Sequence, residues 1–207
     1  MERHENSKEM KKLLVILVIS LFPLCCIHSG NRSGFGVKAG LSYTTISGWR
    51  MTKYKTSGFI GGTYSIEMKN NWYFQPELLF SNIGSNLKDD KTILSGGYIG
   101  IYGIETPVNI SYRPSLNRQT NMIFDIGMYS FIGLFGKKEY KYYESPTIND
   151  SPFDAIKRFN VGINLGVGMK YKAYSTTVSF QRGLTDLSKN GGGIYHQSFR
   201  FSIGYYF

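Results

Sequence analysis

Apolar and polar residues alternate with a period of two through most of the chain after Gly30. The pattern is clearest in the last twelve residues, where one face carries Phe199, Phe201, Ile203, Tyr205 and Phe207. The other face of this segment carries His196, Ser198, Arg200, Ser202 and Gly204. A period of two indicates β-strands. No helical stripe of useful length is present in this part, so the sequence predicts an all-β fold.

Eight segments show this alternation and predict eight strands. They are residues 35–44, 58–68, 72–80, 98–110, 122–128, 159–171, 174–182 and 196–207. Strands of soluble sandwiches are typically about five or six residues long. A strand that crosses a bilayer at about 45° needs roughly 9–11 residues. The length of most segments therefore favours a transmembrane barrel over a soluble sandwich.

The connections between the predicted strands alternate between long and short. The long ones are residues 48–57, 83–96, 136–158 and 185–195, and the short ones are 69–71, 113–120 and 172–173. Outer-membrane barrels combine short periplasmic turns with longer extracellular loops. The sequence thus predicts an eight-stranded antiparallel up-and-down barrel with both ends of the barrel chain on the periplasmic side.

The two faces of the predicted strands differ in a way that a soluble barrel does not explain. Aromatic residues lie near strand ends on the apolar face, namely Tyr43, Trp72, Tyr98, Tyr112, Tyr171, Tyr205 and Phe207. Such girdles mark the two membrane interfaces. Glycine dominates the opposite face, although a soluble surface would favour charged residues. We therefore expect the apolar face to contact lipid.

An apolar run at residues 13–22 follows Lys11 and Lys12 and is too short to span a bilayer. It predicts a cleavable signal peptide over residues 1–29, the first nine of which fit an over-extended start, and a barrel domain over residues 30–207. Lipidation at Cys25 or Cys26 is the alternative. Both cysteines fall in the leader, so disulfides and thiol chemistry are not expected in the barrel.

The chain is basic, with 24 Lys and Arg against 14 Asp and Glu and a net charge of +10. Removal of residues 1–29 takes away four basic and three acidic residues and leaves a net charge of +9. A basic balance favours nucleic acid or an anionic surface as partner. For an exported protein, an anionic membrane surface is the better match, and no nucleic-acid partner is expected.

Three segments and the C-terminus resemble the PorT-like (OmpA/OmpX-type) outer-membrane β-barrel proteins of Bacteroidetes. The segments are residues 36–43 (GVKAGLSY), 75–81 (QPELLFS) and 104–108 (IETPV), in which Thr106 replaces the usual Ile. The resemblance implies an eight-stranded barrel in the outer membrane and, for founding members, a link to protein secretion. The aromatic C-terminus with Tyr205 and Phe207 is similar to the signal that the barrel-assembly machinery reads.

Charged and polar residues on the glycine-rich face are expected to point into the lumen. The candidates for a polar network there are Lys38, Glu77, Glu105, Asp125, Lys170 and Arg200, accompanied by Glu67, Gln75, Asn109, Asn160 and Asn164. An eight-stranded barrel is just wide enough to be filled by side chains. Charges in such a lumen need partners, so we expect a network that fixes the strand register. A narrow small-solute pore is the alternative.

The sequence offers little for catalysis. His196 and Ser198 are spaced as in lipid A deacylases, but no carboxylate follows, and both are expected to face the lumen. Gly162, Gly166 and Gly168 lie within a strand with no following helix, so they do not form a phosphate-binding loop. We expect no enzyme activity, no metal and no cofactor.

The predicted outer loops are rich in lysine and tyrosine. Lys137, Lys138, Lys141, Tyr142 and Tyr143 begin the longest loop, and Arg50, Lys53, Tyr54 and Lys55 lie in the first. Cations at this height can pair with lipopolysaccharide phosphates, and tyrosines suit protein recognition. A merely solvated loop is the alternative.

Taken together, the sequence predicts a monomeric, non-catalytic outer-membrane barrel with a structural or binding role, whose partners are lipopolysaccharide or proteins. An accessory part of an outer-membrane secretion or assembly apparatus is the first alternative, and a narrow pore is the second. The barrel-assembly machinery is an expected partner during biogenesis.

Overall fold

The computed structural model describes residues 34–48, 52–89, 94–143 and 148–207. The predicted signal peptide and its two cysteines lie outside these residues. The described strands are β1 (Gly34–Ser47), β2 (Thr52–Lys53), β3 (Lys55–Lys69), β4 (Trp72–Leu87), β5 (Leu94–Tyr112), β6 (Thr120–Tyr142), β7 (Ile148–Asp150), β8 (Phe159–Tyr171), β9 (Tyr174–Gly183) and β10 (Tyr195–Tyr206). One 3-10 helix, η2, spans Pro152–Asp154. No helix within the described ranges is long and apolar enough to cross a membrane.

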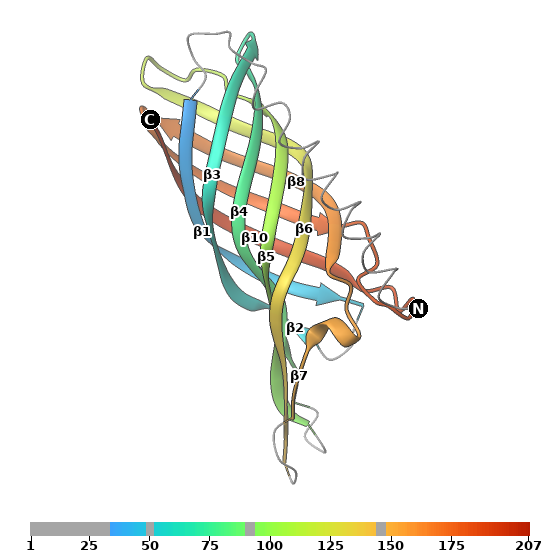
Figure 1. Ribbon diagram of the computed structural model, residues 1–207. Helices are drawn as coiled ribbons and strands as arrows, with labels where there is room; N and C mark the ends of the chain where they lie inside the picture. The colour runs from blue at the N-terminus through green and yellow to red at the C-terminus, as the bar shows by residue number, and fades with distance from the viewer. Residues whose placement is uncertain (1–33, 49–51, 90–93, 144–147) are drawn as a thin grey trace. The chain divides into compact units, whose positions relative to one another are not determined.

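Eight of these strands close into a ring (Figure 1). The order is β4, β3, β1, β10, β9, β8, β6, β5, and β5 pairs back with β4. All pairings are antiparallel, and the register of β1 with β10 runs from Gly36 opposite Tyr206 to Ser47 opposite Tyr195. A closed ring bonds the backbone N–H and C=O groups that hydrocarbon would leave without partners. The predicted eight-stranded antiparallel barrel is confirmed.

The apolar face of the strands points outward, as the alternation predicts. Large exposed side chains on this wall include Leu41, Ile60, Leu78, Ile126, Met128, Leu165, Val178 and Ile203. Aromatic groups border the wall at two heights. Trp72 packs on Tyr112 with ring centroids 4.9 Å apart, and Tyr102 stacks on Phe135 at 5.3 Å.

The spacing of the two aromatic groups matches a membrane. Tyr102 and Tyr112 lie ten residues apart on β5, which corresponds to about 23 Å at ~3.3 Å per residue and ~45° tilt. An apolar band of roughly 25 Å is typical of outer-membrane barrels. We call the end of the barrel at Trp72 and Tyr112 the turn end and the opposite end the loop end.

The connections at the turn end are short, as predicted. Asn70 and Asn71 join β3 to β4 with φ angles of 53° and 69°, and Lys172 between β8 and β9 has a φ of 52°. Two successive residues of positive φ form the primed turns that match the twist of a hairpin, and asparagine tolerates this conformation best after glycine.

Strands β4, β5 and β6 are longer than the sequence predicts. Their loop-end parts cover much of residues 83–96 and 136–142, which we expected to be loops. β5 and β6 remain paired with each other beyond the ring, and β7 pairs with β6 opposite residues 138–140 (Figure 1). The apolar pattern stops there because this part of each strand lies beyond the aromatic groups, where neither face must contact hydrocarbon.

Thr106, the departure from the family pattern, has a compensating partner. It lies opposite Ser130 in the β5–β6 register, and the two hydroxyl oxygens are 2.6 Å apart. Both residues alternate with lumen-facing neighbours and so lie on the outer wall. A paired hydroxyl is far less costly in hydrocarbon than an unpaired one, so Ser130 makes Thr106 acceptable at this position.

Replacement of Met128 by arginine tests the lipid-facing wall. Met128 is 54 % exposed and lies on β6 between Phe124 at the turn end and Phe135 at the loop end. An arginine near the midplane of a barrel wall costs about 2–4 kcal/mol. We expect Met128→Arg to lower the free energy of unfolding by this amount in urea titrations in phospholipid vesicles.

The matched control is Leu116→Arg, in the turn between β5 and β6. Leu116 is 66 % exposed but lies outside the apolar band, where the same change costs about 1 kcal/mol or less. Equal losses in the two variants would contradict the assigned membrane position.

Candidate functional site

The turn end of the lumen is organised around Arg113, which is 3 % exposed. Its guanidinium donates hydrogen bonds to Gln75 and, at 3.1 Å, to the hydroxyl of Ser65. It also lies over the ring of Tyr73 at 4.5 Å. Arg113 lies in a connection that the sequence predicts, but it was not among the expected lumen residues. The two-residue period was the available signal for its inward direction, because Arg113 lies two residues after Ser111, which is buried.

Lys38 and Glu77 form an ion pair next to this group. The Lys38 Nζ lies 2.9 Å and 3.1 Å from the two carboxylate oxygens of Glu77. Gln75 donates a 2.6 Å hydrogen bond to the same carboxylate. Gln75 therefore links the Lys38–Glu77 pair to Arg113, and one polar chain crosses the lumen from Lys38 on β1 to Arg113, which directly follows β5.

A second ion pair joins Glu105 of β5 to Arg200 of β10. The Nη1 atom of Arg200 lies 2.5 Å from Oε1 of Glu105, and Glu105 also accepts hydrogen bonds from Gln181 at 2.8 Å and Ser81 at 2.7 Å. The guanidinium lies 3.9 Å from the ring centroid of Phe59. Both charges are at most 6 % exposed, so the pair is buried and the carboxylate is well satisfied.

Within the described residues, the remaining two members of the expected network, Lys170 and Asp125, form no ion pair. The Nζ of Lys170 lies 4.3 Å from the ring centroid of Tyr206, so its contact is a cation–π contact. Asp125 is buried on β6 opposite Ser111 of β5. The structure thus brings together four of the six residues as two ion pairs.

His196 and Ser198 do not form a catalytic pair. His196 is 1 % exposed, and its Nδ1 lies 2.9 Å from the hydroxyl of Tyr129. Among the described residues, neither His196 Nε2 nor the Ser198 hydroxyl has a hydrogen-bond partner. A serine nucleophile needs its base within hydrogen-bond reach. Nor does any group of three His, Cys, Asp or Glu residues in the described part suit a metal ion.

The loop end of the lumen is closed by an apolar plug. Strand residues contribute Ile46, Ile83, Leu87, Ile99, Ile101, Tyr129 and Phe131, and the connections between strands add Phe153, Ile156, Leu187 and Ile194. Each of these side chains is at most 8 % exposed. We call the last four the plug residues. The sequence does not predict the plug residues, because isolated apolar residues in a loop carry no periodic signal.

Hydrogen bonds between two connections hold the plug residues in place. The N–H of Lys157 donates to the carbonyl of Leu187 at 2.7 Å, and that of Lys189 donates to Ala155 at 3.0 Å. The Asp186 carboxylate accepts N–H bonds from Ser188 at 2.9 Å, Ile194 at 2.8 Å and Gly193 at 3.1 Å. These backbone donors hold the pKa of Asp186 below its usual value.

The expected lysine cluster is divided between the two faces of the β5–β6 hairpin. Lys137, Lys138, Lys141 and Tyr142 lie in β6 and not in a loop. Lys138 pairs with Ile99, which points into the core, whereas Lys137 pairs with Gly100. Cross-strand partners share a face. Lys137 therefore faces outward and Lys138 faces the mouth, where its Nζ lies 4.6 Å from the Tyr140 ring centroid.

Tyr142 and Tyr143, which we expected to contact a partner, have different surroundings. Tyr142 packs against the apolar plug, so it is part of the mouth. Tyr143 is 54 % exposed, and its hydroxyl donates a 2.7 Å hydrogen bond to Asp89.

The C-terminal aromatic residues lie on the lipid-facing wall at the turn end. Tyr205 packs edge-on against Tyr174 and Phe207, in both cases at 5.2 Å between centroids. Phe207 stacks on Phe35 at 5.8 Å and is 76 % exposed. Tyr205 and Phe207 therefore share one outward face at the end of the last strand.

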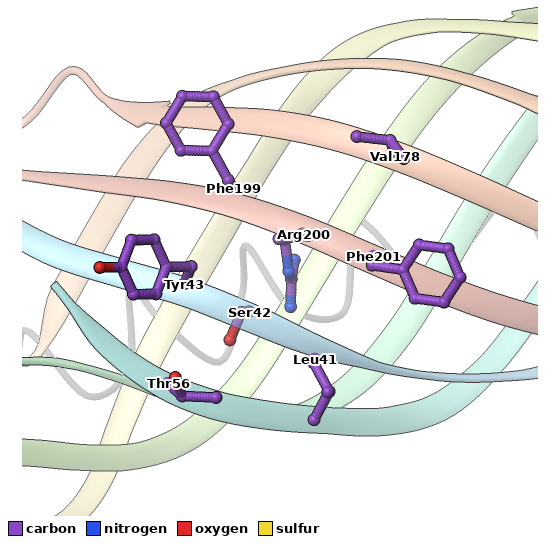
Figure 2. Close-up of a pocket in the computed structure, with 8 residues that line it drawn as sticks. All are labelled: Leu41, Ser42, Tyr43, Thr56, Val178, Phe199, Arg200 and Phe201. Carbon is purple, nitrogen blue, oxygen red and sulfur yellow. The ribbon is translucent and has the colours of Figure 1, made fainter.

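A shallow furrow of about 260 Å³ crosses the outer wall between β1 and β10. Figure 2 shows the lining side chains, in which the pairs Leu41–Phe201 and Tyr43–Phe199 border the backbone of Ser42 and Arg200. Arg200 contributes no charge to the furrow because its side chain pairs with Glu105 in the lumen. The furrow is part of the apolar surface that contacts lipid.

Arg200→Met tests the buried ion pair. Loss of one partner leaves the Glu105 carboxylate uncompensated, which typically costs about 3–5 kcal/mol. We expect a loss of this size in the free energy of unfolding, measured by urea titration of the folded barrel. Lys141→Met is the control, because Lys141 lies at the surface, 3.5 Å from Glu139, and such pairs contribute about 1 kcal/mol or less. Equal effects would contradict a structural role of the pair.

The plug should loosen only at acid pH. A carboxylate whose pKa is lowered on folding stabilises the folded form above its unfolded pKa of about 3.9, and this stabilisation is lost as the pH falls through the folded value. We expect the protection factors of the Gly193 and Ile194 amides to stay constant from about pH 8 to pH 5 and to fall below about pH 4. Asp186→Ala should abolish this pH dependence, whereas Asp154→Ala, at an exposed site, should keep it.

Comparisons with known proteins agree with this architecture. Residues 21–189 match the family model described as "Outer membrane protein beta-barrel domain". A search among curated protein sequences gave no match.

Several solved structures resemble the chain at low sequence identity. Neisserial surface protein A has 7 % identity and a TM-score of 0.47, with 84 % of this chain and 97 % of that chain covered. OprG from Pseudomonas aeruginosa has 12 % identity and a TM-score of 0.45, with 84 % and 96 % covered. Ail of Yersinia pestis, in complex with the heparin analogue sucrose octasulfate, has 13 % identity and a TM-score of 0.41, with 84 % and 97 % covered.

The family match extends over most of the chain, and the closed ring with its apolar outer wall is the architecture that the family description names. The chain belongs to the outer membrane protein β-barrel domain family and is a protein of the outer membrane.

Proposed function

We propose that this protein is a non-catalytic barrel that acts through its outer surface and not as a conduit. The observation that carries this proposal is the apolar plug. Phe153, Ile156, Leu187 and Ile194 close the loop end of the lumen, and the Lys38–Glu77 and Glu105–Arg200 ion pairs cross the lumen below it. A solute would have to displace both a packed apolar layer and paired charges.

The binding surface that we propose is the β5–β6 hairpin with the neighbouring connections. It carries lysines on both faces and exposes Tyr143 beyond the apolar band. Lysines at this height suit the phosphates of lipopolysaccharide, and tyrosines suit a protein partner. We infer that the barrel is monomeric, since its own ring closes without a second chain.

We further infer that the chain is a PorT-like member of this family. The three segments that resemble PorT-like proteins supply Lys38, Glu77 and Glu105, which are three of the four charges in the two lumen ion pairs. This supports an accessory role in a secretion or assembly apparatus as the second candidate function. The outward-facing Tyr205 and Phe207 support recognition by the barrel-assembly machinery.

Conductance measurements test the closed lumen. We expect the folded, full-length protein to give no stepwise currents in planar bilayers at neutral pH, because the plug and the ion pairs fill the lumen. The control is the combined variant Phe153→Ser and Leu187→Ser, which keeps the ring but replaces two plug side chains. Regular current steps from the wild-type protein would overturn the proposal.

A further inference from the structure

Lys55 reaches across the outer wall of the barrel. It begins β3, yet its Nζ lies 3.5 Å from the carbonyl oxygen of Ile99 on β5 and 4.9 Å from the Tyr98 ring centroid. Strand β4 runs between β3 and β5, and its Gly84 pairs with Gly100 of β5. A Cβ atom placed on Gly100 would meet the Lys55 Nζ at 2.7 Å. The ammonium group therefore occupies a notch that exists because Gly100 has no side chain.

The notch opens to the lipid-facing side. Ile99 and Ile101 are 0 % and 2 % exposed and belong to the apolar plug, so Gly100 between them faces outward. Phe80, Tyr102 and Phe135 form the aromatic group on this side of the barrel, with centroids 5.3–6.3 Å apart. Lys55 thus lies on the same wall as these rings and not in the lumen.

The height of the notch is that of lipid headgroups. Gly100 lies two residues beyond Tyr102 toward the loop end, which is about 5 Å along the barrel axis at ~3.3 Å per residue and ~45° tilt. Headgroups extend roughly 5–8 Å beyond the hydrocarbon. A cation at this position faces the phosphate layer of the outer leaflet.

Positive charges outnumber negative charges around the notch. Lys137 lies opposite Gly100 in the β5–β6 register and shares its outward face. Glu139 is 3.0 Å from Lys137 and 3.5 Å from Lys141, and within the described residues Lys55 has no carboxylate within ion-pair distance. Among the residues that the structure describes, Lys137 and Lys141 therefore share one carboxylate, and Lys55 is left without an ion pair.

We propose that Lys55 and Lys137 bind the phosphate group of a lipid headgroup in the outer leaflet, at the notch over Gly100. This inference rests on the proposed binding role and names its partner. Among the described residues, Lys55 donates one long hydrogen bond, to the Ile99 carbonyl, which leaves two ammonium protons for phosphate oxygens. The acyl chains of the same lipid would lie on the apolar wall below Phe80, Tyr102 and Phe135.

Gly100→Ala and Lys55→Ala test the site in complementary ways. The first displaces the ammonium group without changing any charge, and the second removes it. The probe is lipid A with two phosphates, added to the folded, full-length protein in a non-ionic detergent and counted by native mass spectrometry. We expect each variant to weaken binding about fivefold to tenfold, which is the contribution of one charge-assisted contact. Lys137→Ala should weaken it by a similar factor.

Two controls match these variants. Gly58→Ala adds the same methyl group to another strand position, where a Cβ meets only a carbonyl oxygen at 3.6 Å. Lys172→Ala removes the same charge at the turn end, in the connection between β8 and β9 and outside the proposed binding surface. Both should bind lipid A as the wild type does. Heat-modifiable migration on gels checks that every variant is folded.

Failure of the lipid site at Gly100 and failure of the proposed function would give different results. Wild-type affinity in both Lys55→Ala and Gly100→Ala would overturn the site, even if the bilayer measurements show a closed lumen. Equal loss in Lys172→Ala would indicate unspecific charge attraction and would also overturn it. Dephosphorylated lipid A should bind the wild-type protein as weakly as intact lipid A binds the Lys55→Ala variant. Competition by inorganic phosphate at concentrations equal to those of lipid A would assign the notch to a free anion instead of a lipid.

Discussion

The need to bond every backbone polar group inside hydrocarbon determines the rest of this structure. Without water, an open sheet edge would leave a row of N–H and C=O groups unpaired at several kcal/mol each. The pairing of β1 with β10 removes that edge. Closure with only eight strands then leaves a narrow interior, so the lumen is filled by side chains. Both the polar network and the apolar plug follow from this narrow, closed ring.

The lumen is layered along its axis. Arg113 and the Lys38–Glu77 pair lie toward the turn end, the Glu105–Arg200 pair follows, and the plug closes the loop end. The ion pairs have their partners on strands distant in sequence, so each pair fixes how the strands align. The four charges of the two ion pairs have their partners inside the protein, whereas Lys55, Lys137 and the outward face of the β5–β6 hairpin can meet a partner from outside.

Some features were accessible to sequence reasoning and others were not. The alternation in residues 35–44 and 196–207 identified the lipid-facing side chains, because an apolar wall imposes a period of two. The loop-end parts of β4 and β6 and the first four residues of β5 were not identified, since these strands carry no such pattern outside the membrane. Arg113 lies in the connection after β5, as predicted, but its inward direction was not identified because a connection carries no regular alternation. The lysines at 137, 138 and 141 were grouped as one cluster, whereas strand pairing places 137 and 138 on opposite faces.

The sequence by itself determined the class of fold, the membrane-facing wall and the strand residues that point inward where the alternation is regular, because each depends only on the local two-residue period of a strand. The tertiary structure decided which of these residues meet. Glu105 and Arg200 are 95 positions apart, and their contact depends on the register of all strands between them. The plug residues and the path of Lys55 across β4 to Gly100 likewise depend on how the ring closes. A local pattern shows which way a side chain points, but only the closed ring brings two distant side chains to the same height.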